Sequence, residues 1–164
     1  MGKRGTVVLT GKARINGNFW EGFQPVKSAI AYGIINYCVD LDLSEWGDPD
    51  GSYYYAIRTM GVDKDESAFI GQPNLASIIL PKTLEVLKHD SAGVFLNCEN
   101  LERVTIPESV TEIQEYSCCN CEKLTEIIFA GTIEQWNAIT KAENWNGSVP
   151  ATEVVCSDGT VPLK

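Results

Sequence analysis

The amino-acid sequence predicts a short α/β solenoid, in which stacked units build a parallel β-ladder between two terminal caps. The first observation is a threefold recurrence of one pattern of apolar and small residues. The recurring segments are 69–81, 95–107 and 118–130. Their leucines, Leu75, Leu101 and Leu124, are separated by 101 − 75 = 26 and 124 − 101 = 23 residues. Both separations lie within the roughly 20–29 residues that one strand-containing solenoid unit occupies.

The second observation is an alternation of apolar residues after each leucine. Val104 and Ile106 follow Leu101 in this way, and alternate residues of a strand share one face. Pro107 then ends the strand, because proline has no N–H to donate to a neighbouring strand. One unit cannot bury its apolar edge alone, so about four strands are expected to stack in parallel. The predicted ladder strands lie near 40–44, 77–80, 103–106 and 126–129.

The third observation is a pair of apolar residues, three positions apart, that follows two of the strands. Leu84 and Leu87 form one pair, and Val110 and Ile113 form the next. This spacing predicts one turn of α- or 3₁₀-helix on the return path of each unit.

The repeat pattern is most complete at 106–113 (IPESVTEI), 121–124 (CEKL) and 67–69 (SAF). It resembles the BspA-type leucine-rich repeats of bacterial surface proteins, whose unit reads approximately as I-P, S-V-T-x-I-G, A-F and C-x-x-L. The resemblance covers about residues 38–161. It implies a leucine-rich-repeat solenoid that acts as a non-catalytic protein–protein interaction module in surface adhesion or host contact.

Three residues depart from the family pattern, and we expect them to change the local packing. Gln114 stands in place of glycine, Cys118 in place of phenylalanine and Gln72 in place of cysteine.

The N-terminal segment 1–37 is predicted to cap the first unit. Residues 6–10 (TVVLT) are rich in β-branched side chains, which favours a short strand. Apolar residues within 19–34 follow helical spacing, with Pro25 near the helix start. The alternating segment 38–44 (CVDLDLS) then predicts the first strand of the ladder.

An insertion at about 44–68 separates this strand from the first clear repeat. It begins with a turn sequence at 48–51 (DPDG) and continues with aromatic residues. The candidate aromatic loop consists of Trp46, Tyr53, Tyr54 and Tyr55. These rings are either a platform for a sugar or peptide, since aromatic rings bind by stacking, or anchors of the loop; we favour anchoring.

The last segment is predicted to cap the other end of the solenoid. Thr132 and Gln135 form a capping box at the start of a helix over 132–140. A final strand is predicted at 153–156. The segment is similar to a recurrent C-terminal cap of the same family, which keeps water from the open edge of the core.

The length of 164 residues is that of one domain. We therefore predict a single leucine-rich-repeat domain over 1–164, with an N-terminal cap (1–37), repeats (38–130) and a C-terminal cap (131–164).

The composition excludes several classes of partner. The net charge is −9, which argues against nucleic acid or an anionic membrane because both would repel the protein. No run of about 20 apolar residues is present, so no membrane insertion is expected. The expected partner is a protein, with host and cell-surface proteins among the candidates. We expect a surface or secreted location if an export leader was trimmed, and a cytoplasmic one otherwise.

Six cysteines require an interpretation: Cys38, Cys98, Cys118, Cys119, Cys121 and Cys156. Cys98 and Cys121 occupy the same repeat position, and such residues behave as small buried side chains whose S–H can reach a loop carbonyl. We favour this structural role. The alternatives are a disulfide, or a zinc site formed by Cys118, Cys119, Cys121 and His89. No metal or cofactor is predicted.

No catalytic motif is recognisable. The sequence contains no G-x-S-x-G, P-loop or H-E-x-x-H pattern. The carboxylate pairs Asp40/Asp42 and Asp48/Asp50 are interpreted as solvated residues, the second pair at most holding a weak calcium ion. We predict that the protein is not an enzyme. The alternatives are a thiol or carboxylate site within 44–68, or a spacer module in a larger assembly.

Alternation places one set of strand residues on the outer, concave side of the sheet. One column is Asp40, Ser77, Arg103 and Glu126, and the central column is Asp42, Ile79, Thr105 and Ile128. The candidate partner-binding residues are Asp42, Ser77, Ile79, Arg103, Thr105, Glu126 and Ile128. Ile79 and Ile128 are unusual because outward strand positions are more often polar. They form either an apolar anchor for a partner chain or simply favourable β-forming residues, and we favour the latter slightly.

Overall fold

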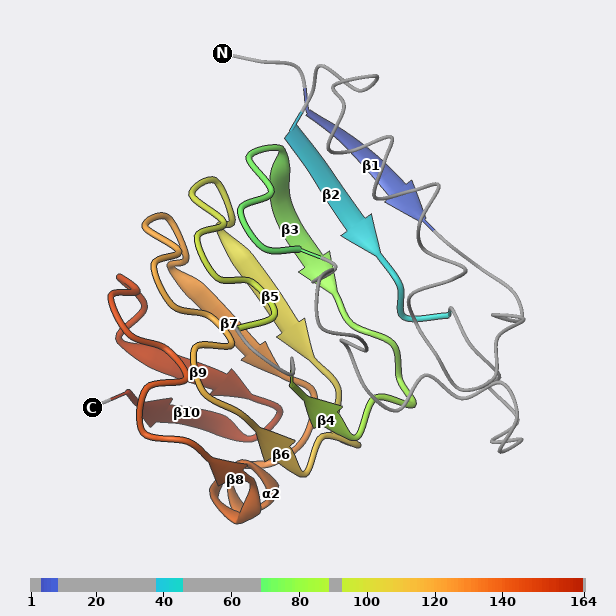
Figure 1. The fold of residues 1–164 in the computed structure, drawn as a ribbon. Coiled ribbons are helices and arrows are strands. Elements are labelled where there is room, and N and C mark those ends of the chain that lie inside the picture. Colours follow the sequence, from blue (N-terminus) through green and yellow to red (C-terminus); the bar gives the residue numbers. More distant parts are fainter. Residues whose placement is uncertain (1–3, 9–37, 46–68, 89–92, 164) are drawn as a thin grey trace.

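The computed structural model describes residues 4–8, 38–45, 69–88 and 93–163. Among these residues, most strands belong to one seven-stranded sheet, called the main sheet below (Figure 1). In spatial order its strands are β1 (Arg4–Val8), β2 (Cys38–Asp42), β3 (Leu75–Ile79), β5 (Arg103–Ile106), β7 (Glu126–Phe129), β9 (Glu153–Cys156) and β10 (Gly159–Pro162). A second sheet contains the short strands β4 (Val86–Leu87), β6 (Glu112–Ile113) and β8 (Thr140–Lys141). From β3 to β9 the chain passes alternately through the two sheets, which is the path of a solenoid.

The predicted parallel ladder is confirmed, and it is longer than predicted. Neighbouring strands from β1 to β9 pair in parallel, and β10 pairs antiparallel to β9. The prediction that 38–44 forms the first ladder strand is wrong, because β1 pairs in parallel with β2. The estimate of about four strands is therefore too low. The β-branched residues at 6–10 predicted a strand close to the observed β1, but this segment lacks the repeat signature, so its pairing partner was not predicted.

The helical turns predicted at 84–87 and 110–113 are also wrong, because the short strands β4 and β6 lie there. Leu84 N donates to Pro81 O (3.0 Å), which closes a tight turn, and the two-residue strand β4 follows. The N–H and C=O groups of β4 pair with those of β6 in the next unit. In a helix the same groups would have paired with each other inside one unit. The return path is consequently extended, and the described residues contain one short helix, α2 (Ile133–Ala138).

The core lies between the two sheets and is built from aligned rows of inward side chains. One row is Leu41, Ile78, Val104, Ile127 and Val154, each at most 1% exposed. Rings extend the core between units. Phe69 and Phe95 lie with centroids 5.4 Å apart, and Phe129 and Trp136 are also 5.4 Å apart. The inward assignment of the strand residues is thus confirmed.

The C-terminal segment contains the predicted capping box. Thr132 Oγ1 accepts from the Gln135 backbone, and Gln135 Oε1 accepts from the Thr132 backbone. Lys141 Nζ donates to Trp136 O (2.6 Å) and Ile139 O (2.8 Å), which satisfies carbonyls at the end of the helix. The predicted final strand is present as β9. It continues through a hairpin into β10, a strand that was not predicted from the sequence.

The remaining domain predictions stay untested. The helix expected within 19–34 lies outside the described residues, and so does most of the 44–68 insertion. The boundaries proposed for the two caps therefore remain predictions.

Tight loops lead into the successive long strands and contain residues with left-handed backbone conformation. These are Gly71 (φ 62°), Asn97 (φ 61°), Asn120 (φ 56°) and Ser148 (φ 61°). Glycine and asparagine tolerate this conformation best. Backbone hydrogen bonds join each loop to the next, as from Gly71 N to Leu96 O (2.8 Å) and from Asn97 N to Cys119 O (3.1 Å). The loops therefore stack in the same order as the strands.

We predict that Val104→Asp destabilises the fold by several kcal/mol, because it places an unpaired carboxylate in the core. The control is Thr105→Asp, one residue further on the same strand and half-exposed, which we expect to cost less than about 1 kcal/mol. Urea denaturation followed by circular dichroism measures both. Equal midpoints for the two variants would contradict the inward assignment of Val104.

Candidate functional site

The outward side chains of the main sheet form the first candidate site, called the sheet face below. It contains Thr6, Val8, Asp40, Asp42, Ser77, Ile79, Arg103, Thr105, Glu126, Ile128 and Val155. The strand register brings these side chains into two parallel rows. All seven candidate partner-binding residues lie on this face, although their role in binding remains a prediction.

The charged row consists of Asp40, Ser77, Arg103 and Glu126 in neighbouring register positions. Arg103 Nε donates to Glu126 Oε2 (2.5 Å), and Ser77 Oγ donates to Asp40 Oδ1 (2.5 Å). These bonds hold the polar side chains against one another across the strands. Exposed ion pairs of this kind contribute little stability, so the row mainly orders its own side chains.

Arg4 joins the charged row from β1, and sequence analysis missed it. Its guanidinium donates to both carboxylate oxygens of Asp40 (2.6 and 2.7 Å) and to Glu102 Oε2 (2.7 Å). The Arg4 guanidinium, with a smaller contribution from the Ser77 hydroxyl, holds the pKa of Asp40 below its usual value. Only the pairing of β1 with β2 reveals this contact, because Arg4 and Asp40 are 36 residues apart.

The apolar row consists of Ile79, Thr105, Ile128 and Val155, on neighbouring strands from β3 to β9. The first three are half-buried, and Val155 is 38% exposed. Val155 was missed in the sequence, although extending the column along 153–156 would have found it. With strands about 4.8 Å apart, the row spans roughly 14 Å.

Beyond Ile79 the same row continues to Asp42 and then to Val8, which is 54% exposed. Asp42 Oδ1 accepts a hydrogen bond from Ser44 N (2.9 Å), so the carboxylate is oriented by the following turn. The apolar row therefore has an oriented negative charge at one end.

Several candidate residues cannot be placed. Trp46, Tyr53, Tyr54 and Tyr55 lie outside the described residues, as do Asp48, Asp50 and His89. The aromatic platform, the calcium interpretation and an enzymatic site within 44–68 therefore stay predictions or alternatives.

The repeat cysteines donate their S–H groups to loop carbonyls. Cys98 Sγ lies 2.7 Å from Phe69 O, and Cys121 Sγ lies 3.0 Å from Phe95 O. Burial raises the pKa of Cys98 to about 12 and that of Cys121 to about 11, so both are held as thiols. The described residues contain no cluster of three or more His, Cys, Asp or Glu side chains suited to a metal ion.

Two of the three residues that depart from the family pattern, Gln72 and Cys118, are buried. Cys118 is fully buried in the place of phenylalanine. Gln72 replaces the repeat cysteine, and among the described residues its buried Oε1 accepts no hydrogen bond. A buried acceptor left in this state costs about 1–3 kcal/mol.

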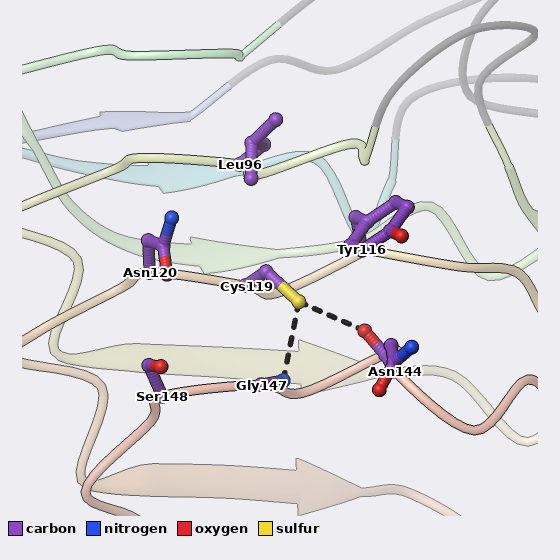
Figure 2. Close-up of a pocket in the computed structure, with 7 residues that line it drawn as sticks. All are labelled: Leu96, Tyr116, Cys119, Asn120, Asn144, Gly147 and Ser148. Atoms are coloured by element: carbon purple, nitrogen blue, oxygen red, sulfur yellow. Dashed lines mark hydrogen bonds between the residues drawn. The ribbon is translucent and has the colours of Figure 1, made fainter.

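A groove in the stacked loops is the second candidate site, and no sequence motif predicted it. Its volume is about 500 Å³. The lining residues are Leu96, Tyr116, Cys119, Asn120, Asn144, Gly147 and Ser148 (Figure 2). Cys119 Sγ lies in the middle of the groove, where it donates to Asn144 O (2.8 Å) and accepts from Gly147 N (3.1 Å). Burial raises the pKa of Cys119, which disfavours a reactive thiolate.

We predict that the contribution of Arg4 to stability disappears in acid. The pKa of Asp40 is lower in the folded state than in the unfolded state. The Arg4–Asp40 pair therefore stabilises the fold at pH values above the unfolded pKa of Asp, and this stabilisation is lost as the pH falls through the folded pKa. At about pH 7, Arg4→Gln should therefore lower the free energy of unfolding, by less than about 1 kcal/mol because the pair is partly exposed. At about pH 2 the same substitution should have a smaller effect, because protonation of Asp40 then competes with the ion pair. Urea midpoints at the two pH values measure the difference, with the exposed Lys123→Gln as control. An equal effect of Arg4→Gln at both pH values would contradict the pairing.

We expect all six cysteines to be titratable thiols in denaturant without reductant. Before denaturation, the half-buried Cys38 should react first, because the other five side chains are buried. Thiol-reagent kinetics and elemental analysis measure these properties. Fewer than six thiols, or a stoichiometric amount of zinc, would show that the structural interpretation is wrong.

Comparison with known protein families supports the repeat assignment. The family model described as BspA type leucine rich repeat region (6 copies) matches residues 63–140, a narrower range than the 38–161 expected. No curated protein and no solved structure matched the chain. In the described part of the chain, none of the helices has the length and apolar character needed to cross a bilayer. Leucine-rich repeats generally mediate protein interactions and are typically non-catalytic. Residues 63–140 are therefore a BspA-type leucine-rich-repeat region, in agreement with the stacked parallel strands.

Proposed function

We propose that this chain is a non-catalytic module of a bacterial surface-type repeat protein that binds a partner protein through the sheet face. The observation that carries the proposal is the apolar row of Ile79, Thr105, Ile128 and Val155, aligned by the register of four neighbouring strands. Outward positions on a parallel sheet need not be apolar for the fold. Three aliphatic side chains in one row therefore suggest selection for contact with another surface.

The surroundings of the apolar row suit a protein partner. Binding energy at protein interfaces concentrates in a small apolar centre surrounded by polar contacts. Here the charged row runs beside the apolar row, with Arg103 paired to Glu126 and Asp40 paired to Arg4. These ordered side chains would form the polar rim.

The charge of the sheet face favours a partner with basic side chains. Asp42 lies at the end of the apolar row, Glu126 belongs to the charged row, and Glu102 contacts Arg4 beside that row. The net charge of −9 would attract such a partner from a distance and increase the rate of association. We accordingly propose a partner surface that presents aliphatic side chains next to lysine or arginine.

The family assignment supports a role outside the cell. BspA-type repeats are typically associated with surface proteins, and we propose adhesion to a host or cell-surface protein as the finer function. Thiol catalysis has little support among the described residues, because Cys98, Cys118 and Cys121 are buried and have raised pKa values. The module is therefore proposed to bind and not to transform its partner.

We predict that the triple change Ile79→Thr, Ile128→Thr and Val155→Thr weakens partner binding by about tenfold or more, because hot-spot truncations typically cost over 1 kcal/mol each. Threonine keeps the β-branched shape, so the melting temperature should change little. Partners would first be found by screening arrays of extracellular and bacterial surface proteins with the purified chain. The dissociation constant would then be measured by calorimetry.

The matched control is Val86→Thr, which makes the same kind of change at a half-buried position on the second sheet. Its affinity should equal that of the parent. A triple variant that folds normally and binds with parental affinity would show that the sheet face is not the binding site.

A further inference from the structure

The side chains at one position of the repeat, beside the groove in the stacked loops, become smaller from one unit to the next. Asn97, Asn120 and Ser148 have the same left-handed conformation in three successive loops, so they are equivalent positions. Asn97 N donates to Cys119 O, and Asn120 N donates to Gly147 O (2.9 Å). The residues just before these equivalent positions are Leu96, Cys119 and Gly147. The side chain at this position therefore shrinks from leucine to cysteine to hydrogen. A Cβ atom at Gly147 would lie 3.1 Å from Cys119 Sγ. Without a side chain at Gly147, Cys119 Sγ lies close to the loop backbone and accepts a hydrogen bond from Gly147 N (3.1 Å).

The groove combines one exposed aromatic ring with neutral polar groups. Tyr116 is 43% exposed and has a left-handed backbone conformation (φ 57°), which is uncommon for a bulky residue and costs on the order of 1 kcal/mol. Figure 2 shows Tyr116 and Asn144 towards one end, Asn120 and Ser148 towards the other, and Cys119 between them. None of the seven lining residues is charged, although the chain as a whole is strongly acidic.

Backbone groups of the loops are already used in the stack. Tyr116 N donates to Asn144 O (3.1 Å), and Asn120 N donates to Gly147 O (2.9 Å). Asn120 Nδ2 also donates to Asn97 Oδ1 (3.1 Å), so this amide can offer its oxygen as an acceptor. The N–H groups of Tyr116 and Asn120 are therefore already paired, and the Tyr116 ring with the amide and hydroxyl groups around it is left for recognition.

We propose that this groove binds the ring of a neutral pyranose sugar. A pyranose has apolar C–H faces, which stack on an aromatic ring, and hydroxyl edges, which both donate and accept hydrogen bonds. Asparagine and serine side chains also combine donors and acceptors. The volume of about 500 Å³ lies within the range of about 300–1,000 Å³ typical of small-ligand sites. A charged ligand would meet no opposite charge among the lining residues.

An extended peptide is the main competing ligand, and the groove suits it less well. Peptides are commonly held by main-chain hydrogen bonds to an open strand edge. The loop N–H groups of Asn97, Tyr116 and Asn120 donate within the stack. Because this site is in the loops and the protein-binding proposal concerns the sheet face, the two proposals can fail separately.

The test is titration of the ¹⁵N-labelled protein with methyl glycosides of glucose, galactose, mannose and N-acetylglucosamine, followed by amide chemical shifts. Concentrations on the order of 10–100 mM are needed, since one small ring provides only a few kcal/mol of binding energy. At least one glycoside should shift the amides of Tyr116, Asn120 and Asn144 in a saturable way. A capped dipeptide, acetyl-Gly-Asn methylamide, serves as the peptide probe and should leave them unchanged.

Two substitutions at Tyr116 separate stacking from folding. Tyr116→Asn removes the ring and places a residue that tolerates the left-handed conformation, so the variant should fold and bind the glycoside about tenfold more weakly. Tyr116→Phe keeps the ring and should bind within about twofold of the parent. The proposal is overturned if no glycoside gives saturable shifts, if the dipeptide binds in place of the sugars, or if Tyr116→Asn binds as tightly as the parent.

Discussion

Each unit of this solenoid depends on backbone hydrogen bonds that it exchanges with its neighbours. Leu80 N donates to Thr105 O (3.0 Å) and Ala130 N to Ile106 O (2.9 Å), so the ends of the long strands are paired between units. A unit this short would otherwise leave polar backbone groups and an apolar edge in water. The pairing also sets the register. Once one unit is placed, the inward row and the outward rows of the next unit are determined.

Binding surfaces arise in this structure where the units differ from one another. The inward positions vary little in character because they share one core. The outward positions carry no such constraint, and Ile79, Ile128 and Val155 make an apolar row among charged neighbours. In the loops, Leu96, Cys119 and Gly147 differ in size at one repeat position and line a groove of about 500 Å³. Both features follow from the same physical rule, since a repeat fold leaves its outward side chains free to vary.

Electrostatics ties the N-terminal strand to the repeats. Arg4 on β1 contacts Asp40 on β2 and Glu102 just before β5, so one cation neutralises carboxylates from two parts of the chain. This arrangement removes part of the repulsion expected in a protein with net charge −9. It also leaves Asp42 as the acidic group that terminates the apolar row, which gives the sheet face a polarity along its length.

Local patterns in the sequence determined the solenoid, the inward strand residues and the capping box at Thr132, because each depends on residues close together in the chain. Alternation alone also placed Asp42, Ile79, Thr105 and Ile128 in one outward column. Tertiary structure decided the rest. The pairing of β1 with β2, the contact of Arg4 with Asp40 and the groove beside Tyr116 join segments whose sequences carry no sign of one another. Pairing between distant segments and the space left between stacked side chains are properties of the assembled fold, so a local pattern cannot encode them.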